Sequence, residues 1–145
     1  MGKPACPAGR DAGLYRILDA NFNRAKEGLR VCEDICRYGW DDRSLTRAYK
    51  DARHQLTVVL ESLVLAKALK NRDIAADVGR PSTVSEGRRA DLTAVFWANS
   101  QRVKESLRVV EEVVKLLDAN AAQNTKRLRY KVYALEQKAV GAERN

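Results

Sequence analysis

Apolar residues recur along most of this chain at alternating spacings of three and four residues, which is the pattern of helices that bury one face. The period of two that marks β-strands is nearly absent, so the pattern favours helices throughout. The first predicted helix runs from about Leu14 to Tyr38, and Gly39 follows it as a stop. Its buried stripe is predicted to contain Leu18, Phe22, Ala25, Leu29, Cys32 and Cys36.

A second helix is predicted after Asp41 and Asp42, either of which can cap its N-terminus, and it ends near Lys70. Its stripe contains Leu45, Tyr49, Ala52, Leu56, Val59, Leu63 and Ala66. Residues 71–90 are polar, contain Gly and Pro and have no clear period, so they predict a loop of about 20 residues. Loops of this length are usually lids or binding loops, or else mobile.

Two further helices are expected, the second of them capped by Asn120 with Gln123 three residues on. Their stripes contain Phe96, Ser100, Val103, Leu107, Val110 and Val114, and then Leu128, Val132, Leu135 and Ala139. The predicted fold is therefore all-α, an antiparallel bundle of four main helices built from two hairpins. We place the hairpins at about 14–70 and 91–141, joined by the loop 71–90, in a single domain 13–141 behind a flexible tail 1–12.

The chain contains an internal repeat. Residues 20–34 read ANFNRAKEGLRVCED and residues 98–112 read ANSQRVKESLRVVEE, identical at nine of fifteen positions at a constant offset of 78. The partner helices carry a weaker repeat, K-x-x-R-[HY], which begins at Lys50 and again at Lys126. The two hairpins are therefore predicted to be duplicates related by a pseudo-two-fold axis.

Polar residues of the repeat fall on the face that the apolar stripes bury. Asn21 lies near the middle of this face and Arg24 toward its edge, with Asn99 and Arg102 in the second copy. Gly28 and Ser106 follow one turn later and leave room beside them. One interpretation is a pocket for a polar ligand. The other is structural: the asparagines bond each other or cap a neighbouring helix, and the arginines pair with Glu27 and Glu105.

Charged residues of the repeat also follow the opposite, polar side of both helices. They are Glu27, Arg30 and Asp34 in the first copy and Glu105, Arg108 and Glu112 in the second. Surface ion pairs within each helix would account for them. Their repetition also fits a site shared with another helix or with a second subunit.

Composition narrows the function classes. The 145 residues carry a net charge of +8 with 45% apolar and 32% charged residues, the proportions of one globular domain. No apolar run is long enough to span a membrane, and no export signal is visible, so a cytoplasmic location is expected. The Walker A and dinucleotide-binding glycine motifs are absent. With one His among the possible ligands, Cys32 and Cys36 are expected to be core thiols.

The repeated segments resemble the small helical hydroxymethylpyrimidine phosphate kinases of thiamine biosynthesis, which occur alone or as an N-terminal domain fused to thiamine-phosphate synthase. The resemblance covers the chain from Arg16 to about Glu136, and the chain is similar to the stand-alone form. It rests on Ile17–Asp34, Lys50-x-x-Arg53-His54, Arg72-Asp73-x-x-x-Asp77-Val78-Gly79, Arg89-Ala-Asp91-Leu92, the segment Ala98–Glu112 and Leu128-Arg129-Tyr130.

This resemblance implies an ATP-dependent kinase that phosphorylates 4-amino-5-hydroxymethyl-2-methylpyrimidine phosphate to its diphosphate, with Mg²⁺. It implies Glu27, Glu105 and Asp77 as candidates for Mg²⁺ binding or catalysis. The residues expected to contact phosphate or substrate are Asn21, Arg24, Arg30, Arg53, His54, Gly79, Asn99, Arg102, Arg108, Arg129 and Tyr130. The implied partners are a phosphorylated pyrimidine, a nucleotide and thiamine-phosphate synthase, and a homodimer fits as well.

Three alternatives remain from the residues alone. A helical-bundle enzyme could act on another anionic metabolite without ATP, using the same interior Asn and Arg residues. A regulatory or interaction domain could work with thiamine-phosphate synthase. A basic bundle that binds nucleic acid is disfavoured, because aromatic residues make up only 6% of the chain and the repeated polar residues point inward.

Overall fold

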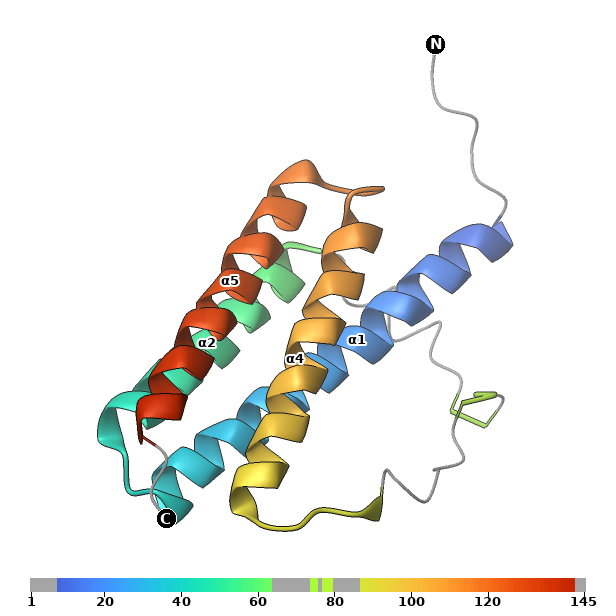
Figure 1. The fold of residues 1–145 in the computed structure, drawn as a ribbon. Helices are drawn as coiled ribbons and strands as arrows, with labels where there is room; N and C mark the ends of the chain where they lie inside the picture. Colours follow the sequence, from blue (N-terminus) through green and yellow to red (C-terminus); the bar gives the residue numbers. More distant parts are fainter. Residues whose placement is uncertain (1–7, 64–73, 76, 80–86, 143–145) are drawn as a thin grey trace.

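The computed structural model describes residues 8–63, 74–75, 77–79 and 87–142 (Figure 1). Its helices are α1 (Ala8–Asp34), which continues into the π-helix η1 (Ile35–Gly39), α2 (Arg43–Ser62), α4 (Leu92–Val114) and α5 (Ala119–Ala142). No strand occurs within these ranges, so the predicted all-α class is confirmed. None of the described helices combines the length and the apolar character needed to cross a membrane.

The four long helices pack side by side in a closed ring of neighbours. Around this ring α1 contacts α2, α2 contacts α5, α5 contacts α4, and α4 contacts α1. Following the colours in Figure 1, each helix runs antiparallel to both of its neighbours. The two hairpins, α1–α2 and α4–α5, therefore meet along both of their helices rather than at one edge.

The predicted apolar stripes form the core. Every stripe position within the described residues is buried, from Leu18 in α1 to Ala139 in α5. Aromatic rings fill one part of this core, where Phe96 lies 4.9 Å from Trp40, 5.2 Å from Trp97 and 5.8 Å from Tyr49 between ring centroids. Burial of these stripes supplies the main driving force for the bundle.

Gly28 sets the distance between α1 and α4. A Cβ atom at this position would lie 2.7 Å from Cγ2 of Val103 and 3.0 Å from the backbone oxygen of Asn99. Because real Cβ atoms essentially never show the first distance and rarely show the second, the two helices approach this closely only with glycine there. The room that the sequence assigned to a ligand is filled at Gly28 by the neighbouring helix.

Several boundaries differ from the prediction. α1 begins at Ala8, six residues before the expected start at Leu14, and α2 ends at Ser62 because Leu63 is extended. The cap of α5 is Asp118, whose Oδ1 accepts from the N–H groups of Asn120 and Ala121, so the predicted cap at Asn120 was wrong. Most of the predicted loop 71–90, and Ala66 of the second stripe, lie outside the described residues. The limits of the domain and of its tail stay predictions.

Candidate functional site

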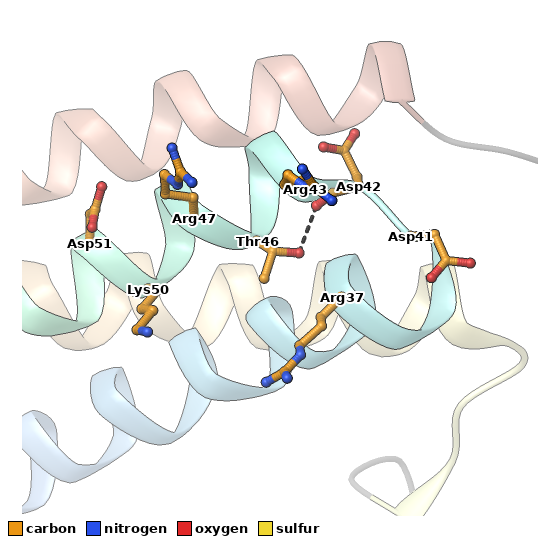
Figure 2. A pocket seen from close by; sticks show the side chains of 8 residues that line it. All are labelled: Arg37, Asp41, Asp42, Arg43, Thr46, Arg47, Lys50 and Asp51. Carbon is orange, nitrogen blue, oxygen red and sulfur yellow. Dashed lines mark hydrogen bonds between the residues drawn. The ribbon is translucent and has the colours of Figure 1, made fainter.

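Four of the predicted site residues line one hollow of about 720 Å³ beside the first half of α1. They are Asn21, Arg24, Glu27 and Asp77, and we call this hollow the Asn21 cavity. Arg16, Asp19, Asn23 and Ile74 also contribute to its wall. Another hollow, of about 590 Å³, lies at the start of α2 and contains none of the predicted residues (Figure 2).

The repeated asparagines satisfy their side chains within their own helices. Nδ2 of Asn21 donates to the backbone oxygen of Ile17, and Nδ2 of Asn99 donates to that of Val95, both at 2.8 Å. The two bonds are related by the repeat and replace the expected mutual or capping bonds. Asn21 is buried, while Asn99 is half-buried.

Arg24 and Arg102 do not form the ion pairs that the structural interpretation expected. Among the described residues, no carboxylate lies within ion-pair distance of either guanidinium. Glu105 instead accepts from Nε2 of Gln101 at 3.0 Å. Arg24 lines the Asn21 cavity, whereas Arg102 lines no described hollow. An unpaired arginine at a cavity is able to hold an anion there.

Four other predicted arginines are paired with carboxylates in a mirrored arrangement. Nε of Arg53 lies 3.1 Å from Oε2 of Glu33, linking α2 to α1, and Nε of Arg129 lies 2.8 Å from Oε2 of Glu111, linking α5 to α4. Both glutamate side chains are only 5% exposed. The hydrogen bond that Arg129 donates to Glu111 raises the pKa of Arg129 above its ordinary value.

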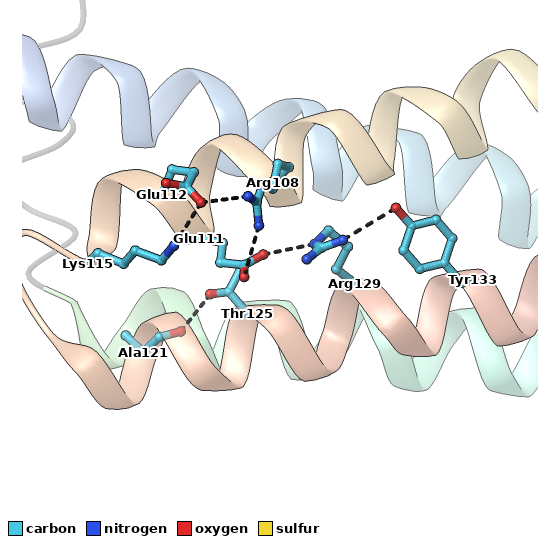
Figure 3. Close-up of polar contacts among 8 residues, drawn as sticks. All are labelled: Arg108, Glu111, Glu112, Lys115, Ala121, Thr125, Arg129 and Tyr133. Carbon is cyan, nitrogen blue, oxygen red and sulfur yellow. Dashed lines mark hydrogen bonds and ion pairs between the residues drawn. The ribbon is translucent and has the colours of Figure 1, made fainter.

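Arg108 extends this arrangement at the surface, as Figure 3 shows. Nη1 of Arg108 lies 3.4 Å from Oε1 of Glu111, and its Nη2 lies 2.9 Å from Oε1 of Glu112. In the first hairpin, Arg30 forms the corresponding pairs with Oε2 of Glu33 and Oδ1 of Asp34, both at 3.6 Å. Lys115 reaches Glu112 at 2.8 Å, and this hydrogen bond lowers the pKa of that carboxyl. The predicted surface ion pairs at Arg30 and Arg108 are therefore present.

A third hollow, of about 440 Å³, lies between α4 and α5 and is lined in part by Glu105, Arg108 and Arg129. Tyr133 also lines it, and the ring of Tyr130 lies 5.8 Å from that of Tyr133 between centroids. His54, at the position of the first hairpin that corresponds to Tyr130, is exposed and has no described partner. The predicted site residues therefore do not form one site. Those that line a hollow are divided between two separate ones, one beside α1 and one between α4 and α5.

The three predicted Mg²⁺ ligands are not brought together. Glu27 and Asp77 line the Asn21 cavity, and Glu105 lines the hollow between α4 and α5. Within the described part of the chain, no group of three His, Cys, Asp or Glu side chains could hold a metal ion. Asp77 accepts from the backbone N–H of Gly79 at 3.0 Å. The binding of ATP and of Mg²⁺ stays a prediction that no observation tests.

Sequence reasoning missed a polar group that enters the core from α4 and α5. The hydroxyl of Ser100 donates to Oε1 of Glu136 at 2.6 Å, and Nζ of Lys104 lies 3.0 Å from the same oxygen. The only signal was a serine within an apolar stripe. Cys32 and Cys36 are buried thiols, as expected, and burial raises the pKa of Cys36 to about 12.

The chain is similar to proteins called thiamine-phosphate synthase. The chain is 43% identical over 131 residues to that of Thermosynechococcus vestitus, matching 90% of this chain and 36% of the relative. It is 41% identical over 122 residues to that of Rhodopirellula baltica, matching 83% of this chain and 32% of the relative. The chain thus spans about a third of the length of these relatives. No solved structure matches it significantly.

These relatives correct the expected activity. They carry the name of thiamine-phosphate synthase, which is a different enzyme from the predicted ATP-dependent hydroxymethylpyrimidine phosphate kinase, so that prediction was wrong. The expected link to thiamine biosynthesis is supported, and so is the expected link to thiamine-phosphate synthase.

The family assignment rests on most of the chain. Residues 16–138, which include both copies of the repeat, all of α2 and α4 and most of α1 and α5, match the ThiD2 family. This range is close to the predicted span of the resemblance, from Arg16 to about Glu136. The chain belongs to the ThiD2 family.

Proposed function

We propose that this chain is a helical domain of thiamine biosynthesis that works in complex with thiamine-phosphate synthase. The observation that carries the proposal is the length relationship: a segment similar to 90% of this chain makes up 36% of a protein of that name. Joining two domains in one chain holds each at a high effective concentration near the other. Wherever such a domain is not joined covalently to the synthase, an interface between the two has to achieve this.

The surface between α4 and α5 has the composition of such an interface. Tyr130 is 58% exposed and Tyr133 is 41% exposed. The guanidinium carbon of Arg129 lies 5.2 Å from the ring centroid of Tyr130 and 5.8 Å from that of Tyr133, and Lys104 lies 5.4 Å from the latter. Exposed tyrosines next to an arginine are typical of the residues that dominate binding at protein interfaces. We call Tyr130 and Tyr133 the tyrosine pair.

The duplicated hairpin supports a role for this pair outside folding. Alignment of the K-x-x-R repeat places His54 opposite Tyr130 and Thr57 opposite Tyr133. The first hairpin thus forms its helix without tyrosines at these positions. An exposed aromatic pair that the fold does not need is better explained by a partner than by stability.

The test is binding to thiamine-phosphate synthase purified from the same organism, measured by sedimentation and by the change in synthase turnover. We expect a complex that Tyr130→Ala weakens about tenfold or more. Tyr38→Ala is the matched control, because Tyr38 is 69% exposed and also lies under an arginine, Arg37, at 4.8 Å. No complex and no change in turnover would contradict the proposal, and equal weakening by both variants would contradict the assigned surface.

A second candidate is favoured by the Asn21 cavity: an enzyme that acts on an anionic metabolite without ATP. Arg16 and Arg24 both line this cavity, and within the described residues neither has a carboxylate partner. NMR titration with inorganic phosphate tests whether the cavity takes an anion. We expect shifts at Asn21 and its neighbours that are lost in Arg24→Ala and kept in Arg102→Ala. Shifts spread evenly over the basic surface would contradict an anion site.

A further inference from the structure

The outward face of α5 carries a strip of uncharged side chains that the bundle does not cover. Tyr130, Tyr133, Gln137 and Val140 follow one another at spacings of three, four and three residues, so they share one side of the helix over about 15 Å. Tyr130 is 58% exposed, Tyr133 41% and Val140 57%, and Gln137 is exposed as well. We call these four residues the α5 strip. Their spacing is that of the contact by which one helix packs along another.

A row of three cationic side chains borders the α5 strip along one edge. At about 100° per residue, Arg127, Lys131 and Lys138 fall within about 40° of one another beside the strip, and we call them the cation row. Among the described residues, none of the three lies within ion-pair distance of a carboxylate, and Arg127 donates to Oδ1 of Asn124 at 3.2 Å. Unpaired positive charges along an uncharged strip are complementary to a surface that carries acidic groups.

Charges at the opposite edge of the α5 strip are already neutralised within the domain. Arg129 reaches from α5 to Glu111 on α4 at 2.8 Å, as Figure 3 shows. Glu136 accepts from the hydroxyl of Ser100 at 2.6 Å and lies 3.0 Å from Nζ of Lys104. The unpaired charge of this face therefore lies on one edge only. A helix packed along the strip would bring one of its own edges to the cation row, so a single row of acidic residues would match it.

The corresponding helix of the first hairpin has neither feature. The repeat aligns the cation row with Asp51, Gln55 and Ser62 of α2, and it aligns Gln137 of the α5 strip with Glu61. α2 nevertheless forms a long helix and makes the corresponding ion pair to its partner helix. The strip and the cation row are thus not needed for the fold, and they belong to the second hairpin alone.

A second copy of this chain does not suit the face. Glu136 is the only acidic residue of α5, and Ser100 and Lys104 already hold it. The α5 helix of another copy would therefore bring further cations to the row and no free carboxylate, and like charges repel each other. The matching occupant is a helix of a different protein.

We propose that the α5 strip docks an amphipathic helix of a partner protein, about three turns long, whose acidic edge lies along the cation row. The apolar face of this helix covers the tyrosine pair, which supplies most of the binding energy. The ion pairs with the cation row fix the orientation of the helix and select the partner. The inference rests on the proposed function, because thiamine-phosphate synthase is the expected source of the helix, and it adds the chemistry of the segment that binds.

The test uses the full chain and two designed amphipathic peptides that differ only along one edge, where the first carries glutamates and the second lysines. The cation-row variant, Lys131→Glu with Lys138→Glu, reverses two charges beside the strip. The matched control, Lys26→Glu with Lys50→Glu, reverses two exposed charges of the first hairpin, where neither residue has a described ion pair. Fluorescence anisotropy of labelled peptides gives the affinities, and a native circular dichroism spectrum confirms that each variant is folded.

We expect the glutamate peptide to shift the NMR signals of the amides of 126–141 and to bind about tenfold more tightly than the lysine peptide. The cation-row variant should reverse this preference, and the control variant should keep it. A preference that the cation-row variant keeps, or that both variants reverse equally, would overturn the proposal. Single-stranded DNA that binds the same amides more tightly than the glutamate peptide would overturn it in favour of a nucleic-acid surface.

The same variants separate this inference from the proposed function. With thiamine-phosphate synthase, the cation-row variant should weaken the complex about tenfold, as Tyr130→Ala does. A complex that Tyr130→Ala weakens and the cation-row variant leaves unchanged would overturn the acidic helix while the proposed function stands. Absence of any complex, together with the expected reversal of the peptide preference, would contradict the proposed function and support the docking of an acidic helix from another protein.

Discussion

The Nε atom of Arg129 lies 2.8 Å from Oε2 of Glu111, and this ion pair fastens α5 to α4 at a carboxylate that is only 5% exposed. The repeat reproduces the pair as Arg53 with Glu33 in the other hairpin. A carboxylate this deeply buried needs its partner, because an isolated charge there would lose its hydration without compensation. This ion pair thus holds the two helices of each hairpin together.

Replacing Arg129 with Met should lower the free energy of unfolding by about 2–3 kcal/mol, since Glu111 then keeps only its longer contact to Arg108. Urea denaturation monitored by circular dichroism measures the change. Arg108→Met is the control: it removes an arginine that is 54% exposed from the same carboxylate, and should cost less than about 1 kcal/mol. Equal losses in the two variants would show that burial does not govern the pair.

Gly28→Ala should destabilise the bundle by about 1–3 kcal/mol, because the new methyl group meets Val103 and the backbone of Asn99 on α4. Gly13→Ala in the same helix meets nothing within 4 Å and should gain up to about 1 kcal/mol from helix propensity. Thermal unfolding of both variants gives the comparison. Adding Val103→Ala should restore part of the loss at Gly28, and a Gly28→Ala protein as stable as the native one would refute the close approach.

Tyr49→Phe should leave stability unchanged or raise it by up to about 1 kcal/mol, because the hydroxyl of Tyr49 is buried without a partner at hydrogen-bond geometry. Burial raises the pKa of Tyr49, and the nearby Ser100 hydroxyl offsets only part of this rise. Tyr49→Ala should instead cost about 3–5 kcal/mol from the cavity it leaves. A large loss for Tyr49→Phe in chemical denaturation would reveal a partner for the hydroxyl.

The two core thiols should make the bundle sensitive to alkali. Burial raises the pKa of Cys36 from 9.0 to about 12, and it raises that of Cys32 above its ordinary value as well. A raised pKa favours the protonated thiol in the folded state, so this stability is fully present below about pH 9 and is lost as the pH rises toward the folded pKa. The unfolding free energy should fall less steeply between about pH 8 and pH 10 after both are replaced with valine. Equal slopes, measured with Cys6→Ser in both proteins, would contradict this.

The helical stripes could be predicted because one buried face per helix imposes a spacing that any side chain must obey, as Leu18, Phe22 and Ala25 do. Helix ends depend on single hydrogen bonds, which explains the misplaced cap: Asp118 and Asn120 are both good caps, and only the backbone decides between them. The π-helix η1 (Ile35–Gly39) could not be predicted from the spacing of apolar residues. Its wider turn lies at the end of the helix, where few apolar positions follow that could show the change in spacing.

The candidate site was harder to predict from the sequence than the helices were. Repetition of Arg30, Arg53 and their counterparts suggested ligand contacts, which stay a prediction. In the structure these arginines form the same ion pairs in each hairpin, within one helix for Arg30 and between two helices for Arg53. In a duplicated chain, polar residues that both halves share are explained first by the fold that both halves share. Residues that differ between the halves indicate a role that only one half has.

The two hairpins meet along both helices, with a close approach at Gly28 and buried apolar residues from both hairpins packed between them. This contact between the hairpins resembles the interface of a dimer whose two subunits are joined in one polypeptide. Because each hairpin buries its apolar face against the other, we expect the two halves to reassemble when they are supplied as separate peptides. The domain is best regarded as a fused pair, in which each half is free to diverge as long as the contact between them is kept.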